Sequence, residues 1–353
     1  MKCCINCFAS HYLHDIIIRN KTLGDCSYCG SINVHIYAPS ELSVFFKPIL
    51  DLYEVNVEHG RLIEHQIISD FNSKIFSPQV VERNMVKILF QDIVQDDIED
   101  YRDLLERNVL LNVKSNGDEE VLIRPLNTTW DSFSEEIKTV NRFHFVNELD
   151  LDKLKNLFKH FEKEIPKGRK FYRARIATGK SGYSRKEMRN PPNNLARGGR
   201  ANPEGISYLY LSSDIKTTMY ETRASLFDYV SVATFRLEEN LKIVHLSQET
   251  YDVFRLAEIE QLGEVILHGS FINKLEEELS KPKRKSDSDL DYLPTQYLSE
   301  LIKSMDIDGI EFKSSLYEKG YNLAIFNPDK FKAINVEVYD VSAIEVNYDK
   351  VSV

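Results

Sequence analysis

The sequence predicts an α+β chain of three parts, and three observations support this prediction. All five cysteines fall within the first 29 residues, and four of them form two C-x-x-C pairs. Residues 40–148 repeat apolar side chains at near-helical spacing, which is typical of an all-helical domain. From residue 149 onward, short apolar runs of strand type alternate with helical patterns. We therefore expect a zinc ribbon over 1–39, a helical domain over 40–148 and an α+β domain over 149–353.

The composition is that of an ordinary globular protein. Of its 353 residues, 42% are hydrophobic and 28% are charged, and the formal net charge is -10. This length gives room for two or more domains with an ample core. No apolar run approaches the roughly 20 residues of a membrane span, and no early segment has the length of a signal-peptide core. We expect a soluble, cytoplasmic protein.

Two cysteine pairs predict a tetrahedral zinc site near the N-terminus. Cys4 and Cys7 form the first pair, Cys26 and Cys29 form the second, and 18 residues separate the pairs. This spacing is typical of structural Zn²⁺ sites, whereas disulfides or unrelated buried thiols are the alternatives. The fifth cysteine, Cys3, could replace its neighbour Cys4 as a ligand. Because so small a ribbon buries little apolar surface, we expect zinc to stabilise it. It could also contact nucleic acid or a partner protein.

The stretch from residue 171 to residue 223 carries the side chains that point to a function. Four of them fall on successive short elements: Arg173 on a strand, Arg200 at a Gly-Gly turn, Tyr210 on a second strand and Glu221 on a helix. Arginines bind phosphate oxygens in pairs, and a carboxylate stabilises developing positive charge. The set therefore suits a phosphate-bearing substrate whose bond breaks through a cationic transition state. Alone, a helical glutamate is most often a solvated surface residue.

A basic strip surrounds this set in an otherwise acidic chain. Residues 167–200 contain eleven lysines and arginines, and their single acid is Glu187. A local positive patch favours a small anionic ligand over long nucleic acid, which would need a wider basic face. A solvated surface loop is the alternative interpretation.

The segment FYRAR…RGGRANPEGISYLYLSSDIKTTMYETR resembles the RES domain, and the resemblance extends roughly over residues 151–340. It implies that Arg173, Arg200, Tyr210 and Glu221 are the family's functional residues. A later segment, YLPTQYLSELIKSMDIDGIEFKSSLYEKGYNLAIF, resembles the second half of the domain. That segment would supply the family serine as Ser314, with Ser315 as the alternative. One position differs, because the residue after the GGR turn is often aromatic in the family and is Ala201 here.

The resemblance implies an ADP-ribosyltransferase-like fold and an enzyme that degrades NAD. Such an enzyme would cleave the nicotinamide–ribose bond by phosphorolysis or hydrolysis, as a toxin or defence effector. The implied catalytic residues are Glu221, Arg173 and Tyr210, and the implied NAD-binding residues are Arg173, Arg200, Tyr210 and Ser314. The expected partner is an antitoxin or another regulatory protein, and the chain is expected to form a homo-oligomer. The alternatives are an ADP-ribosyltransferase that modifies a macromolecule and a non-catalytic adaptor that binds nucleic acid or a partner.

The helical region resembles the domain that precedes some RES domains and has been likened to HEPN domains. HEPN ribonucleases carry an arginine and a histidine at a longer spacing than the three residues that separate Arg61 from His65 here. We therefore interpret this region as a scaffold rather than a nuclease.

Overall fold

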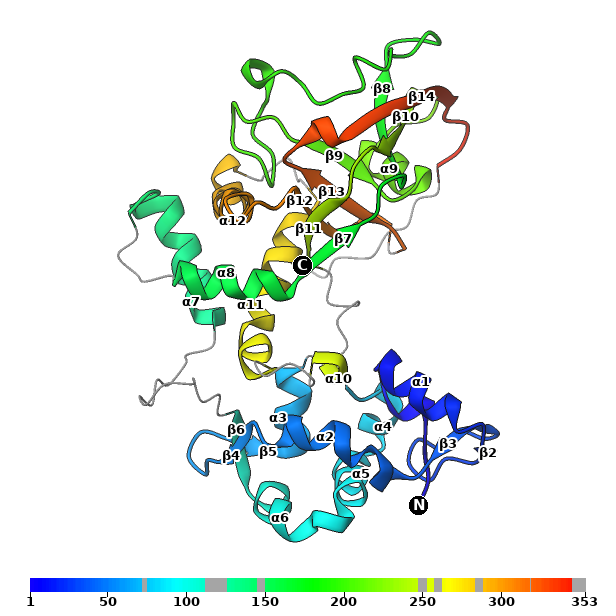
Figure 1. Cartoon of the computed structure of the whole chain (residues 1–353), viewed down its shortest axis with the longest axis vertical. Coiled ribbons are helices and arrows are strands. Elements are labelled where there is room, and N and C mark those ends of the chain that lie inside the picture. The colour runs from blue at the N-terminus through cyan, green and yellow to red at the C-terminus, as the bar shows by residue number, and fades with distance from the viewer. Residues whose placement is uncertain are drawn as a thin grey trace, which may run out of the picture. The chain divides into compact units, whose positions relative to one another are not determined.

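The computed structural model describes residues 1–71, 75–111, 126–144, 150–246, 253–256, 262–282, 288–317 and 319–344 (Figure 1). The chain forms two compact units. The first comprises Met1–Leu126 and Gln248–Ser270, and the second comprises Asn127–Ser247 and Phe271–Val353. The expected boundary between residues 148 and 149 lies outside the described residues, so the three predicted spans remain a prediction.

The first unit begins with a small antiparallel sheet that contains Cys4, and Cys7, Cys26 and Cys29 lie in the segments between its strands. Its strands are β1 (Cys3–Cys4), β2 (Leu23–Gly24) and β3 (Val34–Tyr37), in the order β1-β3-β2. Helix α1 (His11–Arg19) follows β1 and starts at Ser10, whose hydroxyl accepts a backbone amide of the first turn. This bond satisfies one of the amides that a helix start leaves unpaired.

Helices make up most of the remaining first unit: α2 (Ser43–Leu50), α3 (Ile63–Asp70), α4 (Pro78–Glu82), α5 (Val86–Ile93), α6 (Ile98–Glu106) and α10 (Val253–Leu256). The expected helical character is therefore confirmed. The expectation that the region is all-helical needs one correction, because three strands form a second sheet: β4 (Tyr53–Val55), β6 (Asn108–Leu111) and β5 (Arg61–Leu62). These strands are only two to four residues long. Such segments are too short to show an alternating pattern.

One hydrophobic cluster spans the cysteine-rich segment and these helices. The ring of Phe46 on α2 lies 6.0 Å from that of Phe8, 5.9 Å from that of Phe90 and 4.8 Å from that of Phe254. The cluster also contains the buried Cys4 and its partner cysteines. The cysteine-rich segment therefore shares its core with the helices, so its folding is coupled to theirs.

An eight-stranded sheet is the framework of the second unit. Its order is β14-β10-β8-β9-β13-β12-β11-β7. The strands are β7 (Glu162–Ile165), β8 (Lys170–Ala177), β9 (Leu209–Ser212), β10 (Tyr229–Leu237), β11 (Leu241–His245), β12 (Gly309–Lys313), β13 (Tyr321–Ile325) and β14 (Phe331–Asp340). Neighbours run antiparallel except β11 and β12, which are parallel. Strands β8 and β9 pair at a single position, Tyr172 opposite Ser212. The strands that carry Arg173 (β8) and Tyr210 (β9) are therefore joined by very little backbone pairing.

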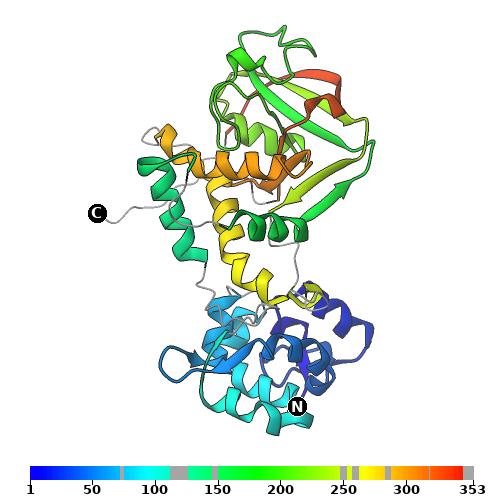
Figure 2. The same ribbon diagram turned by 60° about the vertical axis from the view of Figure 1, so that its left-hand side comes forward.

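The helices of the second unit are α7 (Leu126–Glu135), which continues into a π-helix (Glu136–Val140), and α8 (Leu151–His160), α9 (Ile215–Thr222) and α12 (Leu293–Lys303). Helix α11 (Leu262–Ser280) belongs to this unit from Phe271 onward. Figure 2 shows α8, α11 and α12 from a second direction. Helix α9 packs on β8, where Ile215 and Met219 contact a small cluster around Ala174. No helix in the described ranges is long and apolar enough to cross a membrane.

The structure confirms the α+β class and the predicted positions of the motif residues. Arg173 lies on β8, Tyr210 on β9 and Glu221 on α9, and Ser314 directly follows β12. Apolar side chains of β8, β9, β10 and β13 form one core of the second unit, which includes Phe171, Leu209, Leu211, Phe235 and Leu323. This core fixes the strands from which the polar residues project.

Candidate functional site

The carboxylate of Glu221 receives two side-chain hydrogen bonds from the sheet. Ser314 Oγ donates to Glu221 Oε1 over 2.7 Å, and Asn322 Nδ2 donates to the same oxygen over 2.8 Å. Glu221 itself is exposed, whereas Ser314 and Asn322 are buried. Because both bonds fall on Oε1, they orient the carboxylate without using Oε2.

The end of α9 places Glu221 at this position. The helix begins at Asp214, whose carboxylate accepts the amide of Thr217 over 2.9 Å. It ends after Thr222 because Arg223 adopts a left-handed conformation with φ of 51°. This conformation is uncommon for residues other than glycine, and it stops the helix at once. Glu221 is therefore fixed in the last turn.

Ser314, rather than Ser315, is the serine that reaches Glu221. Ser314 is 1% exposed, and its Oγ accepts the backbone amides of Leu316 and Tyr317 over 3.3 and 3.2 Å. A hydroxyl has one hydrogen to donate, and in Ser314 that hydrogen lies on Glu221 Oε1. Ser315 is exposed. The pair of adjacent serines is thus resolved by burial and by hydrogen bonding.

Asn322 is a member of this site that the sequence did not identify. It lies on β13 directly opposite Ser212 of β9, and Ser212 Oγ donates to Asn322 Oδ1 over 2.8 Å. The available signal was a single polar residue at the start of an apolar strand. A signal of that kind does not show that the residue contacts a helix 101 positions earlier in the chain.

Arg173 has a buried donor that is not satisfied. Its Nη1 is buried and has no hydrogen-bond partner among the residues that the structure describes. Burial, together with the nearby charge of Arg175, lowers the pKa of Arg173 to about 10. A buried cationic donor without a partner is costly unless a ligand satisfies it. Arg173 is therefore a candidate anion-binding residue.

Other cations of the basic strip already have protein partners. The Arg175 guanidinium lies 4.3 Å from the ring of Tyr183. Arg189 Nη2 lies 2.9 Å from a carboxylate oxygen of Asp329. Arg169 Nη2 donates to the hydroxyl of Tyr321 over 3.2 Å. These three arginines are therefore held by protein groups, whereas Nη1 of Arg173 has no hydrogen-bond partner among the described residues.

Tyr210 secures the Gly-rich turn. Its hydroxyl donates to Asn202 Oδ1 over 2.8 Å and accepts the amide of Ala201 over 3.4 Å. Burial raises the pKa of Tyr210 to about 12, although the backbone donors and the positive charges of Arg173 and Arg200 oppose this rise. The phenol is therefore neutral at physiological pH and is held by the turn.

Gly199 is required by this arrangement. A Cβ at that position would lie 2.5 Å from Asn202 Oδ1 and 3.0 Å from the hydroxyl oxygen of Tyr210. The Asn202 amide nitrogen also shares its two hydrogens among three carbonyl oxygens of the loop, those of Arg197, Pro203 and Ile206. The turn that carries Arg200 is therefore shaped by side-chain hydrogen bonds that any larger residue at position 199 would disturb.

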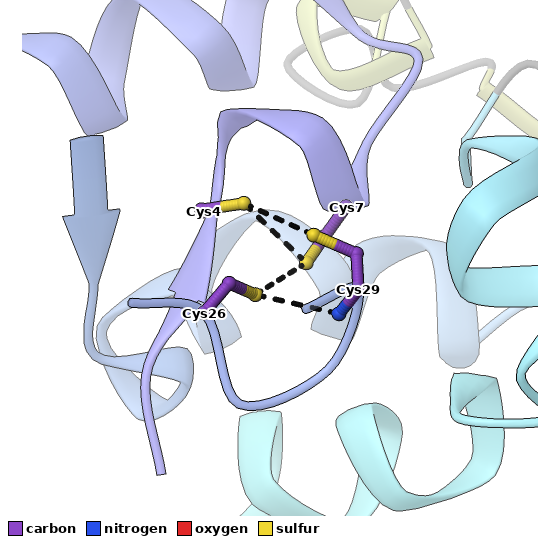
Figure 3. Close-up of side chains that lie close together, drawn as sticks. All are labelled: Cys4, Cys7, Cys26 and Cys29. Atoms are coloured by element: carbon purple, nitrogen blue, oxygen red, sulfur yellow. Dashed lines mark hydrogen bonds between the residues drawn. The ribbon is translucent and has the colours of Figure 1, made fainter. Parts of the chain in front are cut away.

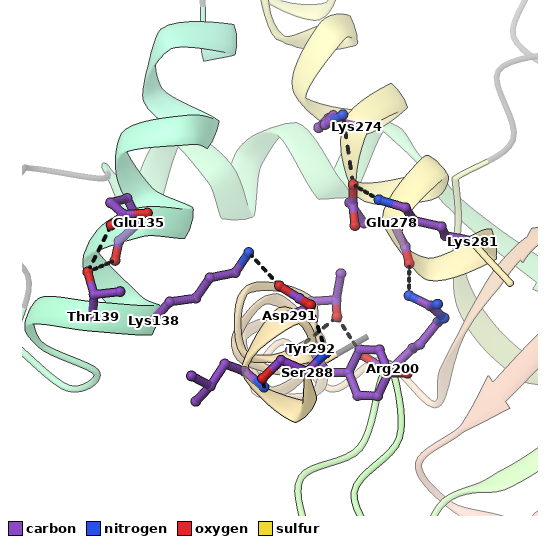
Figure 4. Close-up of polar contacts among 12 residues, drawn as sticks. Glu135, Lys138, Thr139, Arg200, Lys274, Glu278, Lys281, Ser288, Asp291 and Tyr292 are labelled. Atoms are coloured by element: carbon purple, nitrogen blue, oxygen red, sulfur yellow. Dashed lines mark hydrogen bonds and ion pairs between the residues drawn. The ribbon is translucent and has the colours of Figure 1, made fainter. Parts of the chain in front are cut away.

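Arg200 is directed toward α11 and the 3₁₀-helix Asp289–Tyr292 (Figure 4). Its Nη1 donates to the carbonyl of Glu278 over 2.9 Å, and its guanidinium lies 4.8 Å from the ring of Tyr292. It lines a pocket of about 310 Å³ that also contains Lys138 and Lys274. Arg200 is therefore engaged by the protein, in contrast to Nη1 of Arg173.

Four cysteines form a candidate metal centre in the first unit (Figure 3). The sulfurs of Cys4, Cys7, Cys26 and Cys29 are buried and all lie within 4.8 Å of one another. The sulfurs are 3.4 Å apart in the Cys4–Cys29 pair and 3.3 Å apart in the Cys7–Cys26 pair. In a tetrahedral zinc site with Zn–S bonds of about 2.3 Å, neighbouring sulfurs lie about 3.8 Å apart. The cluster could therefore hold a metal ion.

The structure distinguishes Cys4 from Cys3. The Cys3 thiol lies 3.5 Å from the carbonyl oxygen of Tyr37 and is outside the four-sulfur cluster. Backbone amides of Tyr28 and Cys29 donate to Cys26 Sγ over 3.4 and 3.5 Å. These bonds fix the ligand loop around the second pair in the way that outer partners orient metal ligands.

Comparison with known proteins identifies the second unit. The RES domain model matches residues 170–349. The chain is similar at 12% identity to a chain in the crystal structure of the M. tuberculosis MbcT-MbcA toxin-antitoxin complex, with a TM-score of 0.30 and coverage of 54% of this chain and 93% of that chain. None of the curated proteins matches. Because the model spans 180 of the 353 residues, the chain belongs to the RES domain family.

Proposed function

We propose that this protein is an enzyme that degrades NAD by cleaving its nicotinamide–ribose bond. The observation that carries the proposal is the Glu221 carboxylate, which Ser314 and Asn322 hold at the exposed end of α9. Cleavage of such a bond develops oxocarbenium character on the ribose. A carboxylate that is already oriented stabilises this cation more than it stabilises the ground state. Membership of the RES family and the implied NAD chemistry of that family support the assignment.

The position of Glu221 favours a functional role over a structural one. The last turn of a helix has a partial negative charge, so a carboxylate there destabilises the helix by a few tenths of a kcal/mol or more. Glu221 is the next-to-last residue of α9. Two buried donors are nevertheless directed at it. An unfavourable charge that is held by dedicated partners is typical of an active site.

Arg173 is the residue that we propose for the phosphates of NAD. Its buried Nη1 would gain a phosphate oxygen as a partner, which would offset the cost of its burial. Tyr210 would contact the nicotinamide or ribose while its hydroxyl holds the turn. Arg200 would reach the phosphates from its present place beside Glu278. For Ser314 we propose orientation of Glu221 as the main role, because its hydrogen is already donated there.

The ADP-ribosyl cation has three possible acceptors, which are water, phosphate and a macromolecule. A carboxylate two residues before Glu221 would suggest a base for a protein acceptor, but this position is Met219. Inorganic phosphate needs no base because it is anionic at neutral pH. We therefore favour phosphorolysis or hydrolysis. Depletion of NAD would make the protein a toxin or defence effector, and an antitoxin or another regulatory protein would be its partner.

The test is to incubate the purified full chain with NAD and to measure free nicotinamide, with and without phosphate. ADP-ribose identifies hydrolysis, and its 1″-phosphate identifies phosphorolysis. Label from NAD on protein or nucleic acid, absent with Glu221→Gln, would establish macromolecular transfer instead. Absence of nicotinamide release in every condition would refute the proposed reaction.

For the first unit we propose that Cys4, Cys7, Cys26 and Cys29 bind one structural Zn²⁺. Four thiolates leave no open position for a water or substrate, as is typical of structural sites. The metal would fix the two C-x-x-C loops and so complete the hydrophobic core that they share with the helices.

A further inference from the structure

We infer that Asn322 is a positioning residue for Glu221 and that Ser212 holds Asn322 in place. This inference rests on the proposed function, because it assigns a role in the same site. Three side chains form a line from β9 through β13 to α9. Ser212 Oγ donates to Asn322 Oδ1 over 2.8 Å, and Asn322 Nδ2 donates to Glu221 Oε1 over 2.8 Å.

The chemistry of the groups fixes the direction of this line. An ionised carboxylate can only accept hydrogen bonds, so the amide nitrogen of Asn322 must face Glu221. The amide oxygen then faces Ser212, whose hydroxyl donates to it. Each of the three groups therefore has one orientation that satisfies its neighbour. A rotated amide would place two acceptors, Oδ1 and Oε1, against each other.

Ser212 and Asn322 are held rigidly in the sheet, whereas the side chain of Glu221 is not. Ser212 and Asn322 are directly opposed in the antiparallel pair of β9 and β13, and they are 4% and 9% exposed. Glu221 is exposed at a helix end, and the terminal torsion of a glutamate has a broad energy profile. A functional group that is hydrogen-bonded to buried strand residues is positioned more precisely than an exposed side chain without such partners. Because the sheet fixes Asn322, its hydrogen bond restricts the orientation of the Glu221 carboxylate.

Ser314 and Asn322 donate to the same oxygen from two different segments of the chain. Ser314 follows β12, and Asn322 lies on the adjacent β13. Two donors on Oε1 restrict rotation of the carboxylate more than either could alone, and they leave Oε2 for the substrate. A misplacement of about 1 Å at a reacting group can cost roughly 10²-fold in rate. We therefore expect Asn322→Ala to lower kcat by about 10- to 100-fold with little change in KM for NAD.

A purely structural asparagine must be distinguished from a positioning residue. Asn322→Asp keeps the volume of the side chain and the bond from Ser212, but it places a carboxylate against Glu221. Two carboxylates at hydrogen-bond distance share one proton, so one of them stays protonated to a higher pH. The acidic limb of the kcat profile should move to higher pH. Asn335→Asp, on the exposed edge strand β14, introduces the same charge in the same sheet and should not move it.

Ser212→Ala tests whether the line acts through Asn322. Removal of the Ser212 hydroxyl should lower kcat by less than Asn322→Ala does, because the amide stays but loses its anchor. In the Asn322→Ala background the same change should have no further effect, since the group that it orients is gone. Additive losses in the double variant would contradict this route.

The experiment uses the full chain and follows nicotinamide release across pH, with melting curves as a folding control. The inference is upheld if Asn322→Ala lowers kcat at nearly constant KM and Asn322→Asp alone shifts the acidic limb. It is overturned if Asn322→Ala retains the wild-type kcat, or if the Asn322→Asp profile coincides with that of the wild type.

A second readout keeps this inference separate from the proposed reaction. If the wild type releases no nicotinamide, the proposed function fails, but the contact can still be measured. The carboxyl carbon of Glu221 is followed by NMR with ¹³C-labelled glutamate and is assigned by its loss in Glu221→Gln. Asn322→Asp should move its titration midpoint upward, whereas Asn335→Asp should not. An unchanged midpoint in Asn322→Asp would overturn the inference without reference to turnover.

Discussion

Ser314 Oγ lies 2.7 Å from Glu221 Oε1 and joins the end of β12 to the last turn of α9 across 93 residues of sequence. Two backbone amides, those of Leu316 and Tyr317, donate to the same hydroxyl oxygen. These two amides fix the Ser314 hydroxyl, and its hydrogen bond in turn orients the Glu221 carboxylate. Its neighbour Ser315 is exposed and provides a natural control.

Ser314→Ala should lower the rate of nicotinamide release, whereas Ser315→Ala should leave it at the wild-type level. A hydrogen bond to a charged group contributes about 1.5–3 kcal/mol, which corresponds to a loss in kcat of roughly 10- to 100-fold. KM for NAD should change little, because the serine hydrogen is donated to Glu221 rather than to the substrate. Steady-state kinetics of both variants test this expectation. A larger loss in Ser315→Ala would mean that the other serine serves the site.

The four-cysteine cluster predicts the metal content of the protein. Protein purified without chelator should contain about one zinc per chain, and Cys26→Ser should lose it, because four thiolates complete the tetrahedral site. The variant should also melt at a lower temperature, since the cysteine-rich segment shares a core with Phe46 and Phe90. Elemental analysis and melting curves are the measurements.

Cys3→Ser is the matched control for the metal, because Cys3 is buried beside Cys4 but its thiol faces the carbonyl of Tyr37. This variant should retain the full zinc content. Loss of zinc in Cys3→Ser together with its retention in Cys4→Ser would reverse the choice of ligand.

Local signals in the sequence were sufficient to place Arg173, Tyr210 and Glu221 on two strands and a helix. Apolar runs mark β8 and β9. The run Ser212-Ser213-Asp214 marks the start of α9, although the capping group is the Asp214 carboxylate rather than a serine hydroxyl. The cysteine spacing likewise predicted the four-sulfur cluster. For the two strands and the helix this information lies within a few residues of the group concerned, and for the metal site it lies in two C-x-x-C pairs that are 18 residues apart.

Other features depend on pairing across long stretches of chain, and no local pattern carries that information. Asn322 meets Glu221 only because β13 pairs with β9 while α9 packs on β8. The contact of Arg200 with Glu278 joins residues 78 positions apart. The sheet of β4, β5 and β6 was missed for the same reason, since its short strands are defined by their partners.

An ion cluster around the buried carboxylate of Glu311 in the second unit predicts how stability depends on pH. His245 Nδ1 lies 2.5 Å and Lys163 Nζ lies 3.1 Å from Glu311 Oε1, and Glu311 is 1% exposed. Burial alone would raise the pKa of Glu311, but the hydrogen bond and charge of His245, together with Lys163, outweigh it and hold that pKa below its usual value. The folded state therefore favours the ionised carboxylate more than the unfolded state does.

A depressed carboxyl pKa stabilises the fold above the unfolded value of 4.5, and this contribution is lost as pH falls through the folded value. Glu311→Gln should lower the free energy of unfolding near pH 7 by about 1–3 kcal/mol, through loss of charged hydrogen bonds. The difference from the wild type should shrink as the pH falls below 4.5. Denaturant unfolding at several pH values measures this. The control is Glu239→Gln, because Glu239 is exposed in a loop, and its free energy of unfolding should equal that of the wild type at every pH. A difference between Glu311→Gln and the wild type that stays constant with pH would contradict the assignment.

Arg173 should show opposite effects on binding and on stability. Its Nη1 is buried without a partner in the described part of the chain, so the guanidinium costs folding free energy until an anion reaches it. Arg173→Met should therefore raise the melting temperature of the free protein by a few degrees. It should also raise KM for NAD, by about 10-fold or more for a lost charged contact.

The decisive measurement is thermal protection by NAD in a Glu221→Gln background, where the nucleotide is not consumed. NAD should raise the melting temperature when Arg173 is present, because a ligand that binds only the folded state stabilises it. That rise should vanish with Arg173→Met. Arg175→Met is the matched control, since Arg175 already lies against Tyr183 and its loss should leave NAD protection intact. Protection that survives Arg173→Met but disappears with Arg175→Met would move the phosphate site from the buried arginine of β8 to its neighbour.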